Sequence, residues 1–274
     1  MKPTAKRRAV KVRRRLRRGA YVLPSLFTMG NILLGFYAVV LAMRADEQPS
    51  NYAVAALLIF FAGFADTLDG RIARLTGTES DFGKEFDSLA DVLTFGSTPA
   101  LLAYHWALQP LGRLGWLLAL FFLLCTAIRL ARFNVQTKAS DSRYFVGLPS
   151  PAAAGFIAGL IFIAHDDEAR DAGLDPVWLE ALMPFALVII GSLMVSTFRY
   201  PSLKRVDLRQ RLSYRAALVM ATVVLVLVYY PEAFLPGMAF CYALLGPIGW
   251  ILGRLRWYVG PGEKSRQDLE TPKT

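Results

Sequence analysis

The sequence predicts an all-α fold, a polytopic membrane bundle of about eight transmembrane helices with both termini in the cytoplasm. The first observation is composition, because 55% of the 274 residues are hydrophobic and the mean hydropathy is +0.39. Soluble domains contain about 45–50% apolar residues even when glycine is counted. The second observation is that apolar runs of membrane-spanning length recur, and the third is that alternate connections between them are rich in basic residues.

The transmembrane segments are placed where an apolar run approaches the roughly 20 residues that cross a bilayer. In chain order they are 21–43, 52–75, 87–108, 114–131, 145–165, 178–198, 214–230 and 234–253. The second and third flank an acidic stretch, and Pro149 and Pro151 mark the start of the fifth. We expect one transmembrane domain over 21–258, between a basic juxtamembrane segment at 1–20 and a disordered cytoplasmic tail at 259–274.

Charge in the connections predicts the orientation, because cytoplasmic loops of membrane proteins are rich in Lys and Arg. Basic residues precede the first segment, lie at the end of the second and after it, and follow the fourth, sixth and eighth. They are Arg71, Arg74, Lys84, Arg132, Lys138, Arg143, Lys204, Arg205, Arg209, Arg211, Arg254, Arg256, Lys264 and Arg266. The opposite connections hold only Arg44, Arg113 and Arg170. We therefore expect a multi-pass protein of the cell (inner) membrane, with both termini and any site at these basic ends facing the cytoplasm.

The N-terminal basic run supplies much of the net charge of +10. It reads K-R-R-A-V-K-V-R-R-R-L-R-R, with no acid before Asp46. Such a run could bind nucleic acid, but directly before a first span it is typical of an orientation signal that contacts anionic lipid. Anionic membrane lipid is therefore the expected partner, and nucleic acid is not. Cys125 and Cys241 lie far apart in apolar runs, which is not the pattern of a disulfide framework or a zinc site.

The stretch from Asp66 to Asp91 departs from the apolar pattern, because it carries spaced carboxylates between two apolar runs. It reads D-T-L-D-G-R-I-A-R-L-T-G-T-E-S-D-F-G-K-E-F-D-S-L-A-D. An ionisable side chain within a span costs roughly 2.5–3.5 kcal/mol. A cluster of acids therefore needs compensation, and a divalent cation is the candidate.

Helical spacing arranges the carboxylates in two stripes. Positions i, i+3, i+4 and i+7 of the second segment are Asp66, Asp69, Gly70 and Ala73. Positions spaced by four at the start of the third are Gly83, Asp87 and Asp91. Since only about 14 uncharged residues precede the first acid, the stripes are expected near the cytoplasmic boundary. Acids at helix ends also commonly face solvent, but small residues on the same stripes favour a site that admits a metal-bound diphosphate.

The pattern D-x2-D-G-x2-A-R-x8-G-x3-D-x3-D resembles the signature of the CDP-alcohol phosphotransferase family. Every fixed position matches, at Asp66, Asp69, Gly70, Ala73, Arg74, Gly83, Asp87 and Asp91. The chain is also similar to the serine-using members in L-P-S-L-F-T-M-G-N at 23–31, F-D-S-L-A-D-V-L-T-F-G-S-T-P-A at 86–100, R-L-A-R-F-N at 129–134 and F-V-G-L-P-S-P-A-A-A-G at 145–155. One departure is Ser25, where the family commonly has Asn, so an Asn contact is not carried over.

The resemblance implies transfer of the phosphatidyl group of CDP-diacylglycerol to the hydroxyl of L-serine, giving phosphatidylserine and CMP. It implies Mg²⁺ or Mn²⁺ bound by Asp66, Asp69, Asp87 and Asp91, neutralising the diphosphate and the leaving group. It also assigns Asp91 as the general base, although an unperturbed aspartate is a weak base and must be positioned for this role. A homodimer is implied by the resemblance alone.

Residues at the predicted cytoplasmic ends supply the remaining candidates. For CDP-diacylglycerol these are Thr28, Asn31, Asp66, Asp69, Gly70, Ala73, Arg74 and Gly83. For serine or phosphate they are Arg129, Arg132, Asn134, Ser150, Arg199 and Lys204. A planar guanidinium suits a phosphate or carboxylate, but positive-inside placement alone also explains these basic residues.

Two alternatives stay open. Glycerol 3-phosphate or an inositol phosphate could be the acceptor, and such acceptors would favour extra basic residues, whereas serine requires recognition of an ammonium and a carboxylate. A cation transporter would also carry acids in its membrane segments. The acids here cluster at one side, and no inverted repeat is detectable, which disfavours transport.

Overall fold

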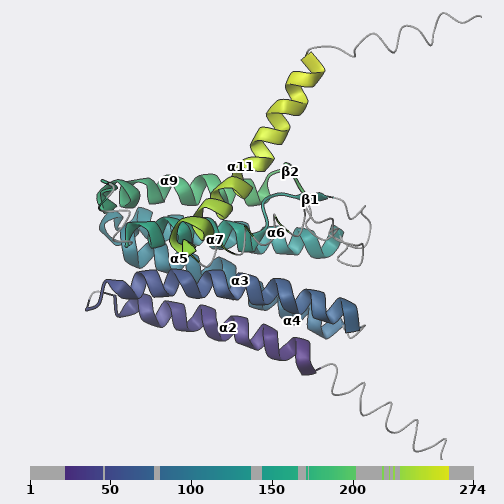
Figure 1. Ribbon diagram of the computed structural model, residues 1–274, viewed down its shortest axis with the longest axis horizontal. Helices are drawn as coiled ribbons and strands as arrows, with labels where there is room; N and C mark the ends of the chain where they lie inside the picture. Colours follow the sequence, from purple (N-terminus) through teal and green to yellow (C-terminus); the bar gives the residue numbers. More distant parts are fainter. Residues whose placement is uncertain are drawn as a thin grey trace, which may run out of the picture.

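Helices account for nearly all of the chain that the structure describes (Figure 1). The computed structural model describes residues 22–45, 47–76, 81–136, 144–165, 173–201 and 229–258, together with Asp171, Leu218, Thr222 and Leu225. Within these residues the strand structure is one pair of three-residue strands, and short turns join the remaining elements. The expected basic segment at 1–20, the tail at 259–274 and most of the segment 214–230 lie outside the described residues.

The long helices follow the predicted segments closely. They are α2 (Val22–Met43), α3 (Ser50–Thr76), α6 (Arg113–Gln136), α7 (Ser150–Ala164), α9 (Pro176–Val195) and α11 (Pro231–Tyr258). The predicted segment 87–108 is a succession of helical pieces: α4 (Asp81–Asp91), the π-helix η1 (Val92–Ser97), α5 (Thr98–Ala103) and the π-helix η2 (Tyr104–Leu108), followed by the short 3₁₀ turn η3 (Gln109–Leu111).

Among the residues that the structure describes, four helices are long and apolar enough to cross a membrane. Their spans are Leu26–Met43, Ser50–Leu68, Arg113–Val135 and Pro176–Val195. The apolar helices Ser150–Ala164 and Phe234–Gly249 are shorter. The structure thus confirms a helical chain with candidate membrane spans, while the number of eight spans and the cytoplasmic placement of the termini stay predictions.

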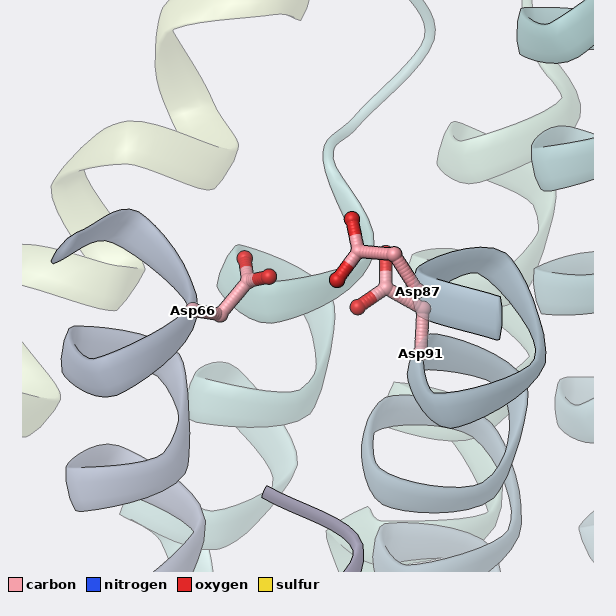
Figure 2. A group of neighbouring side chains, drawn as sticks. All are labelled: Asp66, Asp87 and Asp91. Atoms are coloured by element: carbon pink, nitrogen blue, oxygen red, sulfur yellow. The ribbon is translucent and has the colours of Figure 1, made fainter. Parts of the chain in front are cut away.

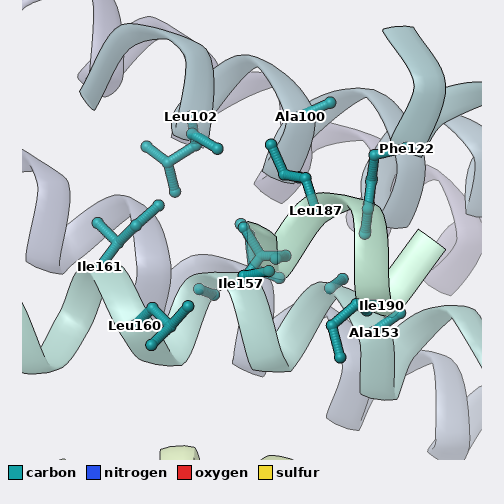
Figure 3. Close-up of a cluster of buried hydrophobic side chains, with 14 of the residues drawn as sticks. Ala100, Leu102, Phe122, Ala153, Ile157, Leu160, Ile161, Leu187 and Ile190 are labelled. Carbon is teal, nitrogen blue, oxygen red and sulfur yellow. The ribbon is translucent and has the colours of Figure 1, made fainter. Parts of the chain in front are cut away.

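The apolar core lies where α5, α6, α7 and α9 meet (Figure 3). Leu102, Phe122, Ile157 and Leu187 come from these four helices in turn and are fully buried in this cluster. Helix α7 also packs against α3 and α11, which makes it the central helix of the bundle. These contacts hold the first residue of α7, Ser150, in place against the neighbouring helices.

The two strands are β1 (Tyr144–Val146) and β2 (Arg199–Pro201), which pair antiparallel. The turn after β1 is held by two hydrogen bonds, from Gly147 N to Phe198 O (2.8 Å) and from Leu148 N to Leu193 O (3.1 Å). Gly147 has a φ of +83°, and a Cβ there would lie 2.2 Å from Met194 O, so no larger residue fits this turn. Helix α7 then begins at Ser150, as Pro149 and Pro151 predict.

The segments predicted to carry the site lie at one end of the bundle. Figure 1 shows the start of α2, the end of α3, α4, the end of α6 and the strand pair together at the right-hand end. The convergence expected from the charge pattern is therefore present in the fold. The acidic stretch is therefore surrounded by the ends of helices and by the strand pair, and not by the middle parts of helices.

Candidate metal and substrate site

Three aspartates from two helices converge at this end of the bundle (Figure 2). Asp66 lies on α3, and Asp87 and Asp91 lie one turn apart on α4. One carboxylate oxygen from each of the three lies within 4.8 Å of the other two. Oxygen ligands bind Mg²⁺ at about 2.1 Å and Ca²⁺ at about 2.3–2.6 Å, so oxygens on opposite sides of a hard cation are separated by about this distance. The donor set and its spacing fit a divalent cation.

Electrostatics alone opposes this arrangement of acids. Two unit charges 4.8 Å apart repel by about 3 kcal/mol at an effective dielectric constant of about 20. A bound divalent cation would offset this repulsion, and three hard carboxylate donors suit Mg²⁺ or Mn²⁺.

The fourth predicted ligand, Asp69, lies on the same α3 helix as Asp66. The helix continues through Asp69, Ala73 and Arg74 to Thr76, as the i, i+3, i+4, i+7 stripe requires. The side chains of these three residues lie outside the described part of the structure. Their roles as metal or diphosphate ligands therefore stay predictions.

The two glycines of the predicted site lie on the same two helices as the carboxylates. Gly70 is half-buried on α3 and Gly83 is half-buried on α4, one turn before Asp87. Both are on the helices that carry the carboxylates. The contact of these glycines with a diphosphate stays a prediction.

Helix α2 holds the carboxylate-bearing helix in place. Thr94 Oγ1, in the π-helix η1 that directly follows Asp91, donates to Asn31 O on α2 (3.1 Å). At Gly35, a Cβ would lie 3.1 Å from Thr94 Cα and 2.9 Å from Thr98 Oγ1, so this close approach requires glycine. π-Helical turns are rare and occur frequently at functional sites. The register of Asp91 is thus coupled to α2.

The predicted donor residues Thr28 and Asn31 are both buried on α2. Asn31 is 2% exposed, and its side-chain oxygen Oδ1 accepts no hydrogen bond from any described residue. A buried amide oxygen without a donor is costly. Asn31 is therefore a candidate to accept a hydrogen bond from a bound ligand.

Arg129 is the buried cation of the site. It lies near the end of α6, is 8% exposed, and its Nη1 donates to Ser150 Oγ at the start of α7 (2.8 Å). It interacts electrostatically with Asp91 and Asp66, and its guanidinium carbon lies 5.9 Å from the centroid of the Phe133 ring. Its Nε has no hydrogen-bond partner among the described residues. Arg129 and Ser150, which the sequence offers as separate candidates from different segments, are in direct contact in the structure.

Two other predicted ligands make contacts within the protein. Arg132 Nη1 donates to Val195 O (3.2 Å) and Ser196 O (3.4 Å), where it caps the C-terminal end of α9. Asn134 Nδ2 donates to Ser88 Oγ on α4 (2.9 Å), which ties the end of α6 to the acidic helix. These contacts give both residues a structural role, and their predicted binding of serine or phosphate stays untested.

The last two predicted ligands follow α9. Arg199 lies in β2, but its side chain is outside the described part of the structure, and Lys204 lies outside it altogether. Sequence reasoning missed Tyr242, a half-buried residue of α11 that interacts electrostatically with Arg129. A single Tyr in an apolar run looks like any core aromatic residue, so no signal in the sequence points to it.

Comparison with known proteins gives consistent matches. A family model described as CDP-alcohol phosphatidyltransferase matches residues 21–190. The chain is similar to a Helicobacter pylori protein named CDP-diacylglycerol–serine O-phosphatidyltransferase, with 38% identity over 84% of this chain and 92% of that protein. It is also similar to a Bacillus subtilis protein of the same name, with 33% identity over 67% of this chain and 92% of that protein. A Methanocaldococcus jannaschii protein of that name is 34% identical over 64% of this chain and 71% of its own length.

Proposed function

The chain belongs to the CDP-alcohol phosphatidyltransferase family, and we propose that it transfers the phosphatidyl group of CDP-diacylglycerol to the hydroxyl of L-serine, giving phosphatidylserine and CMP. The observation that carries the proposal is the convergence of Asp66, Asp87 and Asp91 within 4.8 Å, on the residues of the family signature. The names of the relatives support serine as the acceptor. Membership of a transferase family disfavours the alternative of a cation transporter.

The metal would be held by Asp66, Asp87 and Asp91, with Asp69 as a fourth ligand from the same α3 helix. When bound, Mg²⁺ or Mn²⁺ supplies positive charge that neutralises the diphosphate and the CMP that leaves it. The fit of the site to such an ion rests on its three carboxylates and on their spacing. Thr28, Asn31, Gly70, Ala73, Arg74 and Gly83 would contact the CDP-diacylglycerol.

In the reaction, the serine oxygen forms a bond with the lipid-proximal phosphorus, and the bond from that phosphorus to the oxygen of CMP breaks. The electron pair of the broken bond leaves with CMP. The proton of the serine hydroxyl passes to Asp91, which acts as the general base. Placement of Asp91 by α2, through the contact of Asn31 with Thr94, supports this role because a carboxylate is an effective base only when it is positioned.

The acceptor would bind beside the carboxylates at Arg129 and Ser150. Arg129 is buried, retains unfilled donors after its hydrogen bond to Ser150, and has the planar shape that binds a carboxylate through two parallel hydrogen bonds. Arg132, Asn134, Arg199 and Lys204 are the further candidates for serine or phosphate. Of these, Arg132 and Asn134 also hold α9 and α4 in position.

The site is proposed to face the cytoplasm from a multi-pass protein of the cell membrane, with about eight spans. Support comes from the charge pattern, because the basic connections join the helix ends that surround the acidic stretch. A homodimer and a contact of the basic N-terminus with anionic lipid complete the proposal.

The proposed reaction is tested by following CMP release from CDP-diacylglycerol by the purified protein with Mn²⁺ and a panel of alcohols. Serine is expected to give CMP and phosphatidylserine. CMP release with glycerol 3-phosphate or an inositol phosphate, but not with serine, would refute the acceptor and leave the family reaction intact. Absence of CMP release with every alcohol would contradict the transferase itself.

A further inference from the structure

Ser88 lies on α4 between two of the three carboxylates of the site. It directly follows Asp87 and precedes Asp91 by three residues. At about 3.6 residues per turn, these three side chains leave the helix within an arc of about 100°. Figure 2 shows Asp87 and Asp91 projecting from α4 toward Asp66 on α3. A contact that holds Ser88 therefore also sets the rotation of α4 that turns its carboxylates toward α3.

The opposite face of α4 is apolar and exposed. Phe82 and Leu89 are 73% and 64% exposed, and the ring of Phe82 stacks on that of Phe86 with centroids 5.9 Å apart. The helix is therefore amphipathic, with its carboxylates on the inner face. Because the exposed apolar side chains contribute little packing against the bundle, contacts of the inner face weigh more in setting the rotation of α4.

Ser88 makes two hydrogen bonds on this inner face. Its Oγ donates its single hydrogen to Lys84 O, one turn earlier on α4 (3.0 Å). The same oxygen accepts a hydrogen bond from Asn134 Nδ2 near the end of α6 (2.9 Å). Since the hydroxyl hydrogen is used within α4, the amide of Asn134 must be the donor, and the two bonds agree in direction. Ser88 thus ties the acidic helix to α6.

This tie opposes the repulsion among the carboxylates. Without a cation, Asp87 and Asp91 are repelled from Asp66, and a rotation of α4 would relieve the repulsion by separating the metal ligands. Thr94 ties the continuation of α4 to α2, and Ser88 ties α4 itself to α6. Held from both sides, the helix keeps its carboxylates in place before an ion arrives. Such preorganisation raises affinity, because binding does not have to order the ligands.

We propose that Ser88 is a positioning residue for the divalent cation, and that its hydrogen bond from Asn134 holds the carboxylates of α4 in the orientation that binds the metal. The inference rests on the proposed function, because it takes Asp66, Asp87 and Asp91 to be metal ligands. It gives Asn134 an indirect role in metal binding, which experiment can separate from direct contact with serine or phosphate.

The test is Mn²⁺ binding to the full-length protein, measured by electron paramagnetic resonance in the wild type and in Ser88→Ala. The dissociation constant for Mn²⁺ is expected to rise about threefold to tenfold, which is what one hydrogen bond contributes. Ser88→Thr keeps the hydroxyl and should bind Mn²⁺ within about twofold of the wild type.

Thr67→Val is the matched control for loss of a hydroxyl beside a metal ligand. Like Ser88, Thr67 directly follows a carboxylate of the site and donates to a carbonyl one turn earlier, that of Gly63 (3.0 Å). Thr67 is exposed, and its hydroxyl makes no hydrogen bond to another helix among the described residues. Its replacement should leave Mn²⁺ binding unchanged.

Turnover separates positioning of the metal from direct binding of the acceptor. CMP release by Ser88→Ala and by Asn134→Ala is expected to fall at low Mn²⁺ and to recover at saturating Mn²⁺, with the KM for serine unchanged. The double variant should bind Mn²⁺ no more weakly than either single variant, because both substitutions break the same hydrogen bond.

Three results would overturn the inference: wild-type Mn²⁺ affinity in Ser88→Ala, an equal loss of affinity in Thr67→Val, or full additivity in the double variant. A serine KM of Asn134→Ala that stays raised at saturating Mn²⁺ would make Asn134 a ligand of the acceptor and refute its role through Ser88. Absence of Mn²⁺ binding to the wild type would refute the proposed metal site itself, which distinguishes that failure from a failure of Ser88 alone.

Discussion

Replacement of Asp87 by Asn tests whether the three carboxylates of the site oppose folding in the absence of metal. Each pair has oxygens within 4.8 Å, and each repels by about 3 kcal/mol at an effective dielectric constant of about 20. The substitution Asp87→Asn removes two of the three pairs. Because the side chains are only half-buried, solvent screens the charges, and a net stabilisation of about 1–3 kcal/mol is expected. This corresponds to a rise in Tm of about 2–4 °C for each kcal/mol in a domain of this size.

The assay is thermal unfolding of the purified protein in detergent, first with EDTA and then with Mn²⁺. The wild type is expected to be the less stable protein in EDTA and to gain more stability from Mn²⁺, because a ligand stabilises the state that binds it. Glu85→Gln is the matched control, since it removes one negative charge from an exposed position of the same helix. An Asp87→Asn protein with a lower Tm in EDTA and a Mn²⁺ response equal to that of the wild type would refute the reasoning.

Two further substitutions test how the site is held. Gly35→Ala places a Cβ 3.1 Å from Thr94 Cα and should lower stability by about 1–3 kcal/mol and reduce kcat with it, whereas Gly30→Ala, with no atom within 4 Å of its Cβ, should be neutral in Tm and turnover assays. Equal behaviour of the two variants would contradict a tight contact between α2 and η1. Arg132→Ala removes two hydrogen bonds to the end of α9 and should lower the free energy of unfolding by about 1–3 kcal/mol, measured by denaturation. An unchanged stability with a raised serine KM would instead identify Arg132 as a ligand.

The carboxylate cluster was the part of the site most accessible to sequence reasoning. Spacing by three and four residues on a helix is enough to place Asp87 and Asp91 on one face, and an apolar run before Asp66 is enough to predict a helix there. The meeting of α3 with α4 then follows from their common end in the bundle. Arg129 and Ser150 were predicted as separate candidates, and their hydrogen bond of 2.8 Å is a tertiary contact that no local pattern encodes.

The features that sequence reasoning missed depend on long-range packing. Strand β1 takes the first residues of the segment predicted at 145–165, and β2 follows the segment predicted at 178–198. The two strands pair because hydrogen bonds of Gly147 and Leu148 join parts of the chain about fifty residues apart. The capping role of Arg132 likewise depends on where α9 ends. The path of α11 likewise depends on packing between distant segments, because Tyr242 stacks on Tyr200 of β2 and Gly246 leaves room for the Tyr200 ring.

The central claim is that Asp66, Asp87 and Asp91 together bind a divalent cation, and direct measurement of Mn²⁺ binding tests it. Electron paramagnetic resonance of Mn²⁺ titrated into the purified protein should show tight binding to the wild type. The same titration of Asp66→Ala should show that binding weakened at least tenfold, with CMP release from CDP-diacylglycerol and serine lost in parallel. Wild-type Mn²⁺ affinity together with full turnover in Asp66→Ala would contradict the account.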